Sequence, residues 1–354
     1  MKVCIVSDGL VSLTLANVLI QKGIFVDIYV SKKNIQYDQS RTLGISKSNV
    51  DYFNNEIVNI KKILWEIKNI KIYTEKDYKN ELLNFDNKDK QIFSIIRNYQ
   101  LKKILLKRLK KNKFIKFKHN FNIDKSKYKL VINSDPNHLY IKKFFSKKIE
   151  KNYNSYAYTT TINHKKLSNN DVAIQIFTDN GPIAFLPISN VKTSVVYSVK
   201  DYRKINLGKE IKKYNSKYFI NSIDTISKFK LKSSNSRHYH HHNILAFGDL
   251  LHKIHPLAGQ GFNMTIRDIK VLLELIKFRI EYGLELDRSI FIDFEKKTKH
   301  KNYIFSNSID FVYEFFSLER KIKNPFLKKS IKFVGENRYA NNFFKKFADH
   351  GIVT

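Results

Sequence analysis

The apolar positions near the amino terminus follow first a strand period and then a helix period. Residues 2–6 form a short β-branched apolar run, which is typical of a strand buried in a parallel sheet. Residues 10–22 carry apolar side chains at helical spacing and end at Gly23, a residue type that commonly closes helices. A second strand-like run covers residues 24–30. This pattern predicts a β–α–β unit and therefore a parallel sheet with a right-handed crossover.

The middle of the chain shows a different pattern. Its apolar runs are five to ten residues long and are separated by turn residues, with no helix-length pattern between them. Such runs predict a mostly antiparallel sheet. Two helix-like segments, residues 202–213 and 216–227, follow the runs. We expect the strands of this sheet at residues 153–162, 172–177, 183–188 and 193–199.

The α/β pattern then returns. Residues 243–247 are typical of a strand, a glycine-containing loop follows, and residues 262–282 have a strongly apolar helical pattern. The chain from residue 289 to its end is helical in pattern and rich in aromatic residues. The predicted fold class is therefore α/β, with a discontinuous first domain and an antiparallel sheet inserted between its halves.

Composition narrows the class of protein. Hydrophobic residues make up 42% of the 354 residues, which excludes intrinsic disorder. The single cysteine, Cys4, excludes a disulfide scaffold and a cysteine-based zinc site. No apolar run is long enough to span a bilayer. Asp8 and Gly9 interrupt the amino-terminal apolar stretch, so we expect a cytoplasmic protein without a signal peptide.

The chain is strongly basic, with 65 Lys and Arg residues against 32 Asp and Glu residues and a formal net charge of +33. Such an excess can mark a polyanion partner, but the lysines are spread along the chain, which favours compositional drift. The two explanations are compatible for a protein at a membrane surface. No nucleic-acid-binding motif is present, so we expect no nucleic-acid partner. The Lys-rich stretch 102–111 has helical spacing and is predicted to be a solvated face.

The turn after the first strand is the first candidate for chemistry. A dinucleotide fold has Gly-x-Gly-x-x-Gly there, because glycines permit a tight turn, close approach of the backbone to a pyrophosphate, and helix–strand packing. The three positions here are Ser7, Gly9 and Ser12. Val30 stands where an acidic residue would bind the ribose hydroxyls. On this motif alone, a nucleotide-binding turn and a plain structural turn both remain open.

Residues 248–263 form a more specific motif, GDLLHKIHPLAGQGFN. A strand delivers Asp249 at its carboxyl end, where α/β sheets bind ligands. Gly259 and Gly261 allow an irregular loop whose backbone N–H groups can face a ligand. The start of a helix follows and favours negative charge, such as that of a reduced flavin.

This motif resembles the Gly-Asp-x-x-His-x-x-x-Pro-x-x-Gly-x-Gly-x-Asn signature of the FAD-dependent aromatic-ring monooxygenases. More narrowly, it resembles the ubiquinone-biosynthesis hydroxylases. In that group the loop reads His-x-Ile-His-Pro-x-Ala-Gly-Gln-Gly-x-Asn and is followed by Arg-Asp, as Arg267-Asp268 follows here. Residues 40–46, 177–187 and 195–198 resemble further stretches of the family.

The nucleotide-binding part departs from the family pattern. Asp135 keeps the acid of the family's Ala-Asp-Gly-x-x-Ser-x-x-Arg motif. Its glycine, serine and arginine are replaced by Pro136, Leu139 and Lys142. Together with the altered first turn, these changes leave a second interpretation open. The chain would then be a non-catalytic, flavin-poor descendant of the same fold that binds lipid intermediates or partner proteins in a biosynthetic assembly.

The resemblance implies an α/β fold with an FAD/NAD(P)-binding Rossmann-like domain, an inserted, mostly antiparallel substrate-binding sheet, and C-terminal helices. The discontinuous FAD-binding domain is expected at residues 1–68, 91–150 and 236–296. The substrate-binding sheet domain is expected at residues 69–90 and 151–235, and the C-terminal helical region at residues 297–354.

The resemblance also implies roles for single residues. His255 and Pro256 are the candidate catalytic residues, with His255 on the flavin side and Pro256 on the oxygen and substrate side. Asp249 is expected to bond the ribityl chain, while Gly9 and Arg41 meet the phosphates. No metal site is expected, despite a cluster of histidines at residues 238–242. The expected cofactor-binding residues are Gly9, Arg41, Asp135, Gly248, Asp249, Ala258, Gly259, Gln260, Gly261 and Asn263.

The activity implied by the resemblance is hydroxylation of a polyprenylated phenol in ubiquinone biosynthesis. FAD is the expected cofactor, and NAD(P)H and O2 are the expected co-substrates. A prenylated substrate lives in the bilayer, so we expect a peripheral protein at the inner membrane face, with an anionic membrane surface as a partner. Partner proteins of a biosynthetic complex also remain open.

Overall fold

The computed structural model describes residues 2–30, 40–75, 81–86, 90–119, 123–200, 205–322 and 337–352. Within them, a six-stranded sheet has the order β16-β17-β9-β1-β2-β8 and is parallel except between β16 and β17. The β–α–β unit predicted from the apolar pattern places β1 beside β2. The strands are β1 (Lys2–Val6), β2 (Phe25–Tyr29), β8 (Ile115–Lys118), β9 (Leu130–Asn133), β16 (His240–His241) and β17 (Ile244–Ala246).

Three helices pack together beside this parallel sheet. They are α1 (Leu10–Gln21), α3 (Asn98–Leu109) and α6 (Gln260–Glu281), and the short helix α4 (Leu139–Phe144) follows β9. The helices bury their apolar positions in the same core as the central strands, which removes that surface from water. Gly23 closes α1 with φ +72°, as the sequence predicts.

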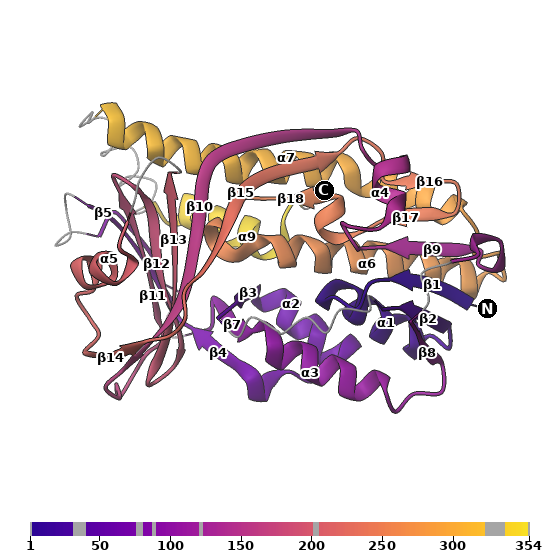
Figure 1. Ribbon diagram of the computed structural model, residues 1–354, viewed down its shortest axis with the longest axis horizontal. Helices are drawn as coiled ribbons and strands as arrows, with labels where there is room; N and C mark the ends of the chain where they lie inside the picture. Colours follow the sequence, from indigo (N-terminus) through magenta and orange to yellow (C-terminus); the bar gives the residue numbers. More distant parts are fainter. Residues whose placement is uncertain are drawn as a thin grey trace.

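A nine-stranded sheet has the order β18-β15-β10-β13-β12-β11-β5-β6, with β14 paired to β10. It is antiparallel except between β5 and β11. Figure 1 shows this sheet on the left and the parallel sheet on the right. Its strands are β5 (Asn69–Thr74), β6 (Leu83–Asp86), β10 (Lys148–His164), β11 (Val172–Thr178), β12 (Gly181–Ser189), β13 (Lys192–Lys200), β14 (Ile220–Ile223), β15 (Ser227–Ser236) and β18 (His252–Lys253).

A small antiparallel sheet has the order β3-β7-β4. Its strands are β3 (Thr42–Ser46), β7 (Phe93–Arg97) and β4 (Leu64–Ile67), and helix α2 (Lys47–Tyr52) follows β3 directly. β3 contacts the amino-terminal part of α6. This contact brings the segment around β3 to the motif that precedes α6.

The remaining described helices are α5 (Leu207–Tyr214), α7 (Ser289–Ile322) and α9 (Arg338–His350). α7 packs on the large sheet, where Phe316 stacks on Phe177 with 4.0 Å between ring centroids. α9 packs on α7, where Phe347 stacks on Phe305 at 4.9 Å. None of the helices in the described ranges combines the length and apolar character needed to cross a bilayer.

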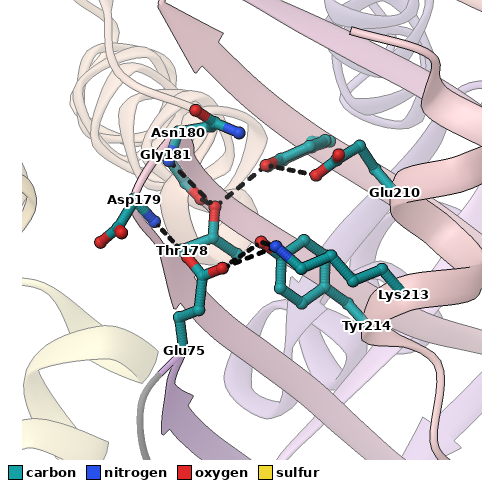
Figure 2. Close-up of polar contacts among 9 residues, drawn as sticks. Glu75, Thr178, Asp179, Asn180, Gly181, Glu210, Lys213 and Tyr214 are labelled. Atoms are coloured by element: carbon teal, nitrogen blue, oxygen red, sulfur yellow. Dashed lines mark hydrogen bonds and ion pairs between the residues drawn. The ribbon is translucent and has the colours of Figure 1, made fainter.

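A polar network fastens α5 to the large sheet (Figure 2). The Glu75 carboxylate accepts hydrogen bonds from the Tyr214 hydroxyl (2.7 Å) and from Lys213 Nζ (2.8 Å). It also accepts one from the Asp179 backbone N–H (2.7 Å). Burial alone would raise the pKa of Glu75, but these three donors lower it overall. The carboxylate therefore anchors the turn between β11 and β12.

Two secondary-structure predictions need correction. Residues 216–227 are not a helix, because they contain β14 and the first residue of β15. The local spacing is overridden by pairing with the edge of β10, where Ile223 lies opposite Ile162. The helix predicted at 202–213 is α5, which begins at Leu207, and residues 201–204 lie outside the described residues. The expected division into domains remains a prediction.

Candidate functional site

Three loops meet where the parallel strands β1, β9 and β17 end. The Ser134 N–H donates to the Val6 carbonyl at 3.1 Å. The Phe247 N–H donates to the Asn133 carbonyl at 2.8 Å. The hydroxyls of Ser12 and Ser134 share a hydrogen bond of 2.7 Å. Because α/β sheets bind ligands at this edge, the three loops form the candidate site.

The loop between β1 and α1 keeps the backbone shape of a glycine-rich turn despite its serines. Ser7 has φ +111°, a conformation that usually requires glycine. Its hydroxyl accepts a hydrogen bond from the Gly9 N–H at 3.0 Å, which stabilises the turn. Gly9 is the N-cap residue of α1 and provides no side-chain cap. The helix therefore presents first-turn N–H groups without acceptors among the described residues, and these belong to Leu10, Val11 and Ser12.

Asp8 lies in the same loop and pairs with a lysine from α3. Its Oδ2 atom is 3.0 Å from Lys102 Nζ. Lys102 is buried, whereas the other lysines of the 102–111 stretch are exposed. The prediction of a solvated face is therefore wrong for Lys102. Helix geometry explains the exception, because Lys102 shares a face with the buried Leu105 and Leu109.

The loop after β17 lies against the start of α1. Gly248 has φ +66°, and a Cβ added there would lie 3.1 Å from Val11 Cγ1. This close approach requires glycine and brings Asp249 beside α1. Asp249 is exposed, and its carboxylate makes no hydrogen bond or ion pair within the described ranges. An acceptor of this kind suits the hydroxyl groups of a ligand.

Asn263 joins the Gly-rich loop to β3. It is 1% exposed, and its Oδ1 accepts hydrogen bonds from the Ser46 N–H and from Asn49 Nδ2, both at 3.0 Å. Its Nδ2 donates to the Gly44 carbonyl at 3.0 Å. Gly259, with φ +62°, packs on Gly44. The amide of Asn263, predicted to bind the cofactor, therefore holds the loop in place.

The start of α6, directly after the loop from β18, carries a buried polar atom without a partner among the described residues. Gln260 begins α6 and is 7% exposed, and its Oε1 meets no donor in the described part of the chain. Beside it, a Cβ added at Gly261 would meet Ile254 Cγ1 at 3.9 Å, which is an ordinary van der Waals contact. Pro256 is half-buried and starts the short 3-10 turn that contains Ala258, whose side chain lies outside the description.

His255 is a buried, neutral imidazole. Its Nδ1 accepts a hydrogen bond from the Leu257 N–H at 3.2 Å. The ring stacks on Tyr313 (4.3 Å) and meets the edge of Tyr153 (4.9 Å). Burial, aided by the positive charge of Lys151, lowers the pKa of His255 to about 3. With Nδ1 accepting, the proton lies on Nε2, which has no partner among the described residues.

His252 has a different environment. Its Nε2 is 2.5 Å from Asp268 Oδ2, and Asp268 Oδ1 accepts a hydrogen bond from Asn302 Nδ2 at 2.9 Å. This chain of contacts joins the loop to α6 and α7. Sequence reasoning missed Asn302, as it missed Lys102 and the tyrosines beside His255. No local pattern could mark these residues, because each comes from a distant part of the chain.

Arg41 directly precedes β3, and Asp135 lies in the loop after β9. The guanidinium of Arg41 is 5.2 Å from the centroid of the Phe229 ring, on β15 of the large sheet. Asp135 stabilises its own turn, because its Oδ1 accepts a hydrogen bond from the Asn137 N–H at 2.9 Å. Its N–H donates to Asn133 Oδ1 at 2.9 Å.

The histidines at residues 238–242 do not form a metal cluster with other side chains in the described ranges. His241 stacks on Phe144 with 4.1 Å between ring centroids. His240 Nε2 is 3.7 Å from Glu295. His241 is thus a packing partner of Phe144. Burial lowers the pKa of His240, so near neutral pH its contact with Glu295 joins a neutral ring to a carboxylate.

Comparison with known proteins relates this site to flavoproteins. Residues 206–278 match the family model of an FAD binding domain. The mitochondrial ubiquinone biosynthesis monooxygenase COQ6 of Danio rerio is 23% identical over 234 residues, which are 53% of this chain and 48% of the relative. The 3-demethoxyubiquinol 3-hydroxylase of Escherichia coli is 26% identical over 158 residues, 42% of this chain and 40% of the relative. The chain thus spans about half the length of the curated relatives it matches.

Solved structures share the fold over nearly the whole chain. The p-nitrophenol 4-monooxygenase PnpA of Pseudomonas putida DLL-E4 has a TM-score of 0.80 at 12% identity, covering 99% of this chain and 98% of its own. A single-residue variant of HpxO of Klebsiella pneumoniae, complexed with FAD, has a TM-score of 0.77 at 11% identity, covering 99% of both chains. The predicted α/β class is confirmed, and the predicted resemblance to FAD-dependent monooxygenases agrees with sequence relatives and fold neighbours alike.

Proposed function

We propose that this chain is an FAD-dependent monooxygenase that hydroxylates a polyprenylated phenol in ubiquinone biosynthesis, using NAD(P)H and O2. The observation that carries the proposal is the convergence of the three loops on the uncapped start of α1, with Asp249 beside it. The matching FAD binding domain model and the names of the relatives support the choice of cofactor and pathway.

The residues present fit a flavin nucleotide. The first-turn N–H groups of α1 suit the negative charge of a diphosphate, and the Asp249 carboxylate suits ribityl hydroxyls. Gln260 Oε1 and His255 Nε2 are buried polar atoms without partners among the described residues, and such atoms are costly unless a ligand pairs with them. Gly261 has no side chain of its own to cover the backbone at the start of α6.

The chain positions the reactants and excludes water. When bound, FAD supplies the redox chemistry that takes electrons from NAD(P)H and activates O2. His255 cannot act as a general acid near neutral pH, because its ring is already neutral there. Its Nε2–H can instead donate a hydrogen bond in a dry environment. Pro256, next in the chain, restricts the backbone on the side proposed for oxygen and substrate.

The surroundings of the loop suit an apolar substrate. An apolar layer lies between the large sheet, the loop and α7, which agrees with a prenylated phenol as substrate. Its members include Leu83, Phe177, Ile254, Leu257, Met264, Phe305 and Phe316. Aromatic and aliphatic side chains of this kind bind hydrocarbon through dispersion and the removal of apolar surface from water.

The flavin content of the purified protein tests the proposal. We expect a yellow protein with an absorbance maximum near about 450 nm, a property of the cofactor. Asp249→Ala should weaken FAD binding at least about tenfold, since it removes a charged hydrogen-bond acceptor. Glu285→Ala is the matched control, because the Glu285 side chain is 74% exposed and lies beyond the far end of α6. A wild-type protein that stays colourless with added FAD would contradict the proposal.

That contradictory outcome would favour the second candidate, a non-catalytic descendant of the same fold. One observation favours it specifically. The Ser7 hydroxyl, which a glycine would lack, already takes up the Gly9 N–H at the turn where a diphosphate would bind. Such a protein would bind prenylated lipids or partner proteins, and it would bind a polyprenylated phenol without flavin. A protein that binds neither flavin nor the prenylated phenol would exclude the first candidate and the lipid-binding form of the second.

A further inference from the structure

The loop that starts α1 contains a negative charge where the proposed diphosphate must come. Asp8 immediately precedes Gly9, the N-cap residue of α1. A carboxylate and a diphosphate side by side repel each other, and the repulsion is strongest where water is limited. A phosphate-binding loop with an aspartate at this position therefore needs a nearby cation.

Lys102 supplies that cation from α3. Its Nζ is 3.0 Å from Asp8 Oδ2, and only 11% of its side chain is exposed. Burial of an ammonium group is unfavourable unless an anion compensates for it. An ordinary surface lysine on α3, such as Lys103, makes no such contact in the described structure. The chain thus keeps a cation at low exposure beside the loop, although Lys102 lies 94 residues from Asp8 in the sequence.

We propose that Lys102 is a diphosphate-binding residue of the FAD site, an inference that rests on the proposed function. Its ammonium neutralises Asp8 and donates a hydrogen bond to a diphosphate oxygen at the start of α1. An ammonium has three donors and no acceptor, so it can bond the carboxylate and a phosphate oxygen together. The cation compensates for the altered glycine turn, because it adds a charge-assisted contact to the diphosphate beside the contacts made by the backbone N–H groups.

The test compares ligands with and without a diphosphate. FAD and ADP carry one, and riboflavin does not. Dissociation constants for all three are measured on the full chain, by flavin fluorescence and, for ADP, by competition. We expect Lys102→Met to raise the dissociation constants of FAD and ADP at least tenfold and to leave that of riboflavin within twofold of the wild-type value. Lys103→Met, an exposed position on the same helix, should change none of the three.

Two further variants separate binding from a merely structural ion pair. Lys102→Arg keeps the charge and should retain most of the FAD affinity. Asp8→Asn leaves the Lys102 charge in place and should increase the affinity for FAD and ADP. If the ion pair were merely structural, the substitution would lower the affinity for all three ligands or for none. Circular dichroism shows whether Lys102→Met folds. If it does not, the Asp8→Asn result still decides whether Lys102 binds the diphosphate.

The outcomes distinguish this inference from the proposed function. A wild-type chain that binds neither FAD nor riboflavin removes the proposed function itself. A wild-type chain that binds FAD, with Lys102→Met binding it equally well, overturns only the role of Lys102. The role of Lys102 is also overturned if Lys102→Met lowers the affinity for FAD and riboflavin equally and Asp8→Asn does not raise the affinity for FAD.

Discussion

His255 combines deep burial with a titratable ring, which makes its effect on stability depend on pH. Its pKa is about 3 in the folded protein, because burial and Lys151 disfavour the charged form. In the unfolded chain a histidine has a pKa near about 6.5. Between these values the unfolded state binds more protons, so acidification favours unfolding. The stability contributed by the neutral ring is complete above about pH 6.5 and is lost as the pH falls toward 3.

We predict that His255→Gln makes stability less dependent on pH. The free energy of unfolding should fall less steeply between about pH 6 and pH 4, by up to about 1.4 kcal/mol per pH unit. Urea denaturation of the two proteins across this range measures the difference. His350→Gln is the matched control, since its side chain is 52% exposed. Parallel curves for wild type and His255→Gln would show that the ring is not held neutral.

Gly248 is the residue where backbone conformation and close packing coincide. Gly283 has nearly the same φ, +64° against +66°, but nothing lies within 4 Å of an added Cβ. Gly283→Ala should therefore cost only the left-handed strain, about 1–2 kcal/mol. Gly248→Ala should cost more, because the Cβ also meets Val11.

Chemical denaturation of both variants measures that difference. The Gly248→Ala, Val11→Ala double variant should be less destabilised than the sum of the two single variants, because it removes the clash. Equal destabilisation by Gly248→Ala and Gly283→Ala would mean that the loop after β17 does not press against α1.

Among the elements, α9 is fastened at its carboxyl end. The Asp349 carbonyl accepts hydrogen bonds from the hydroxyls of Ser46 (3.2 Å) and Ser48 (3.1 Å), and its carboxylate accepts the Ser48 N–H at 2.9 Å. Arg267 lies beneath this end, and its guanidinium is 4.4 Å from the Phe305 ring centroid. Burial lowers the pKa of Arg267 to about 10. The guanidinium therefore stays charged at neutral pH.

We predict that Phe347→Ala loosens α9 without unfolding the rest of the molecule. Phe347 stacks on Phe305, and its loss should cost about 1–3 kcal/mol, less than for a fully buried phenylalanine. Hydrogen exchange of the α9 amides should accelerate, while that of β1 and β9 should not. Phe343→Ala is the comparison, because Phe343 is 63% exposed. Acceleration of exchange in the β1 and β9 amides as well would show that α9 is part of the global folding unit.

For the whole molecule, the net charge of +33 is the dominant surface property. As part of the proposed function, we expect binding to vesicles that contain anionic lipids, because each Lys or Arg near the leaflet contributes about 1 kcal/mol. Binding should weaken steeply between low and physiological salt and be absent with neutral vesicles. Co-sedimentation measures this. Binding that does not depend on salt, or no binding at all, would remove the membrane from the proposed function.

The period of the apolar residues by itself determined much of this protein. It predicted β1, α1 and β2, the four strands β10 to β13 of the large sheet, and α6, because periods of two and 3.6 residues record which side of an element is buried. The motif at 248–263 likewise predicted an irregular loop at Gly259, where the left-handed backbone favours a residue without a side chain, whereas Gly261, predicted for the same loop, lies in the first turn of α6.

Only the tertiary structure decided which distant side chains share an environment. It pairs β14 with β10, brings Lys102 to Asp8, surrounds His255 with two tyrosines, and uses the Asn263 amide to hold β3. Such contacts depend on the order of strands in the sheets and on the packing of helices beside them. A local pattern records that a position is buried, but its partner comes from a segment distant in the sequence, as Lys102 lies 94 residues from Asp8.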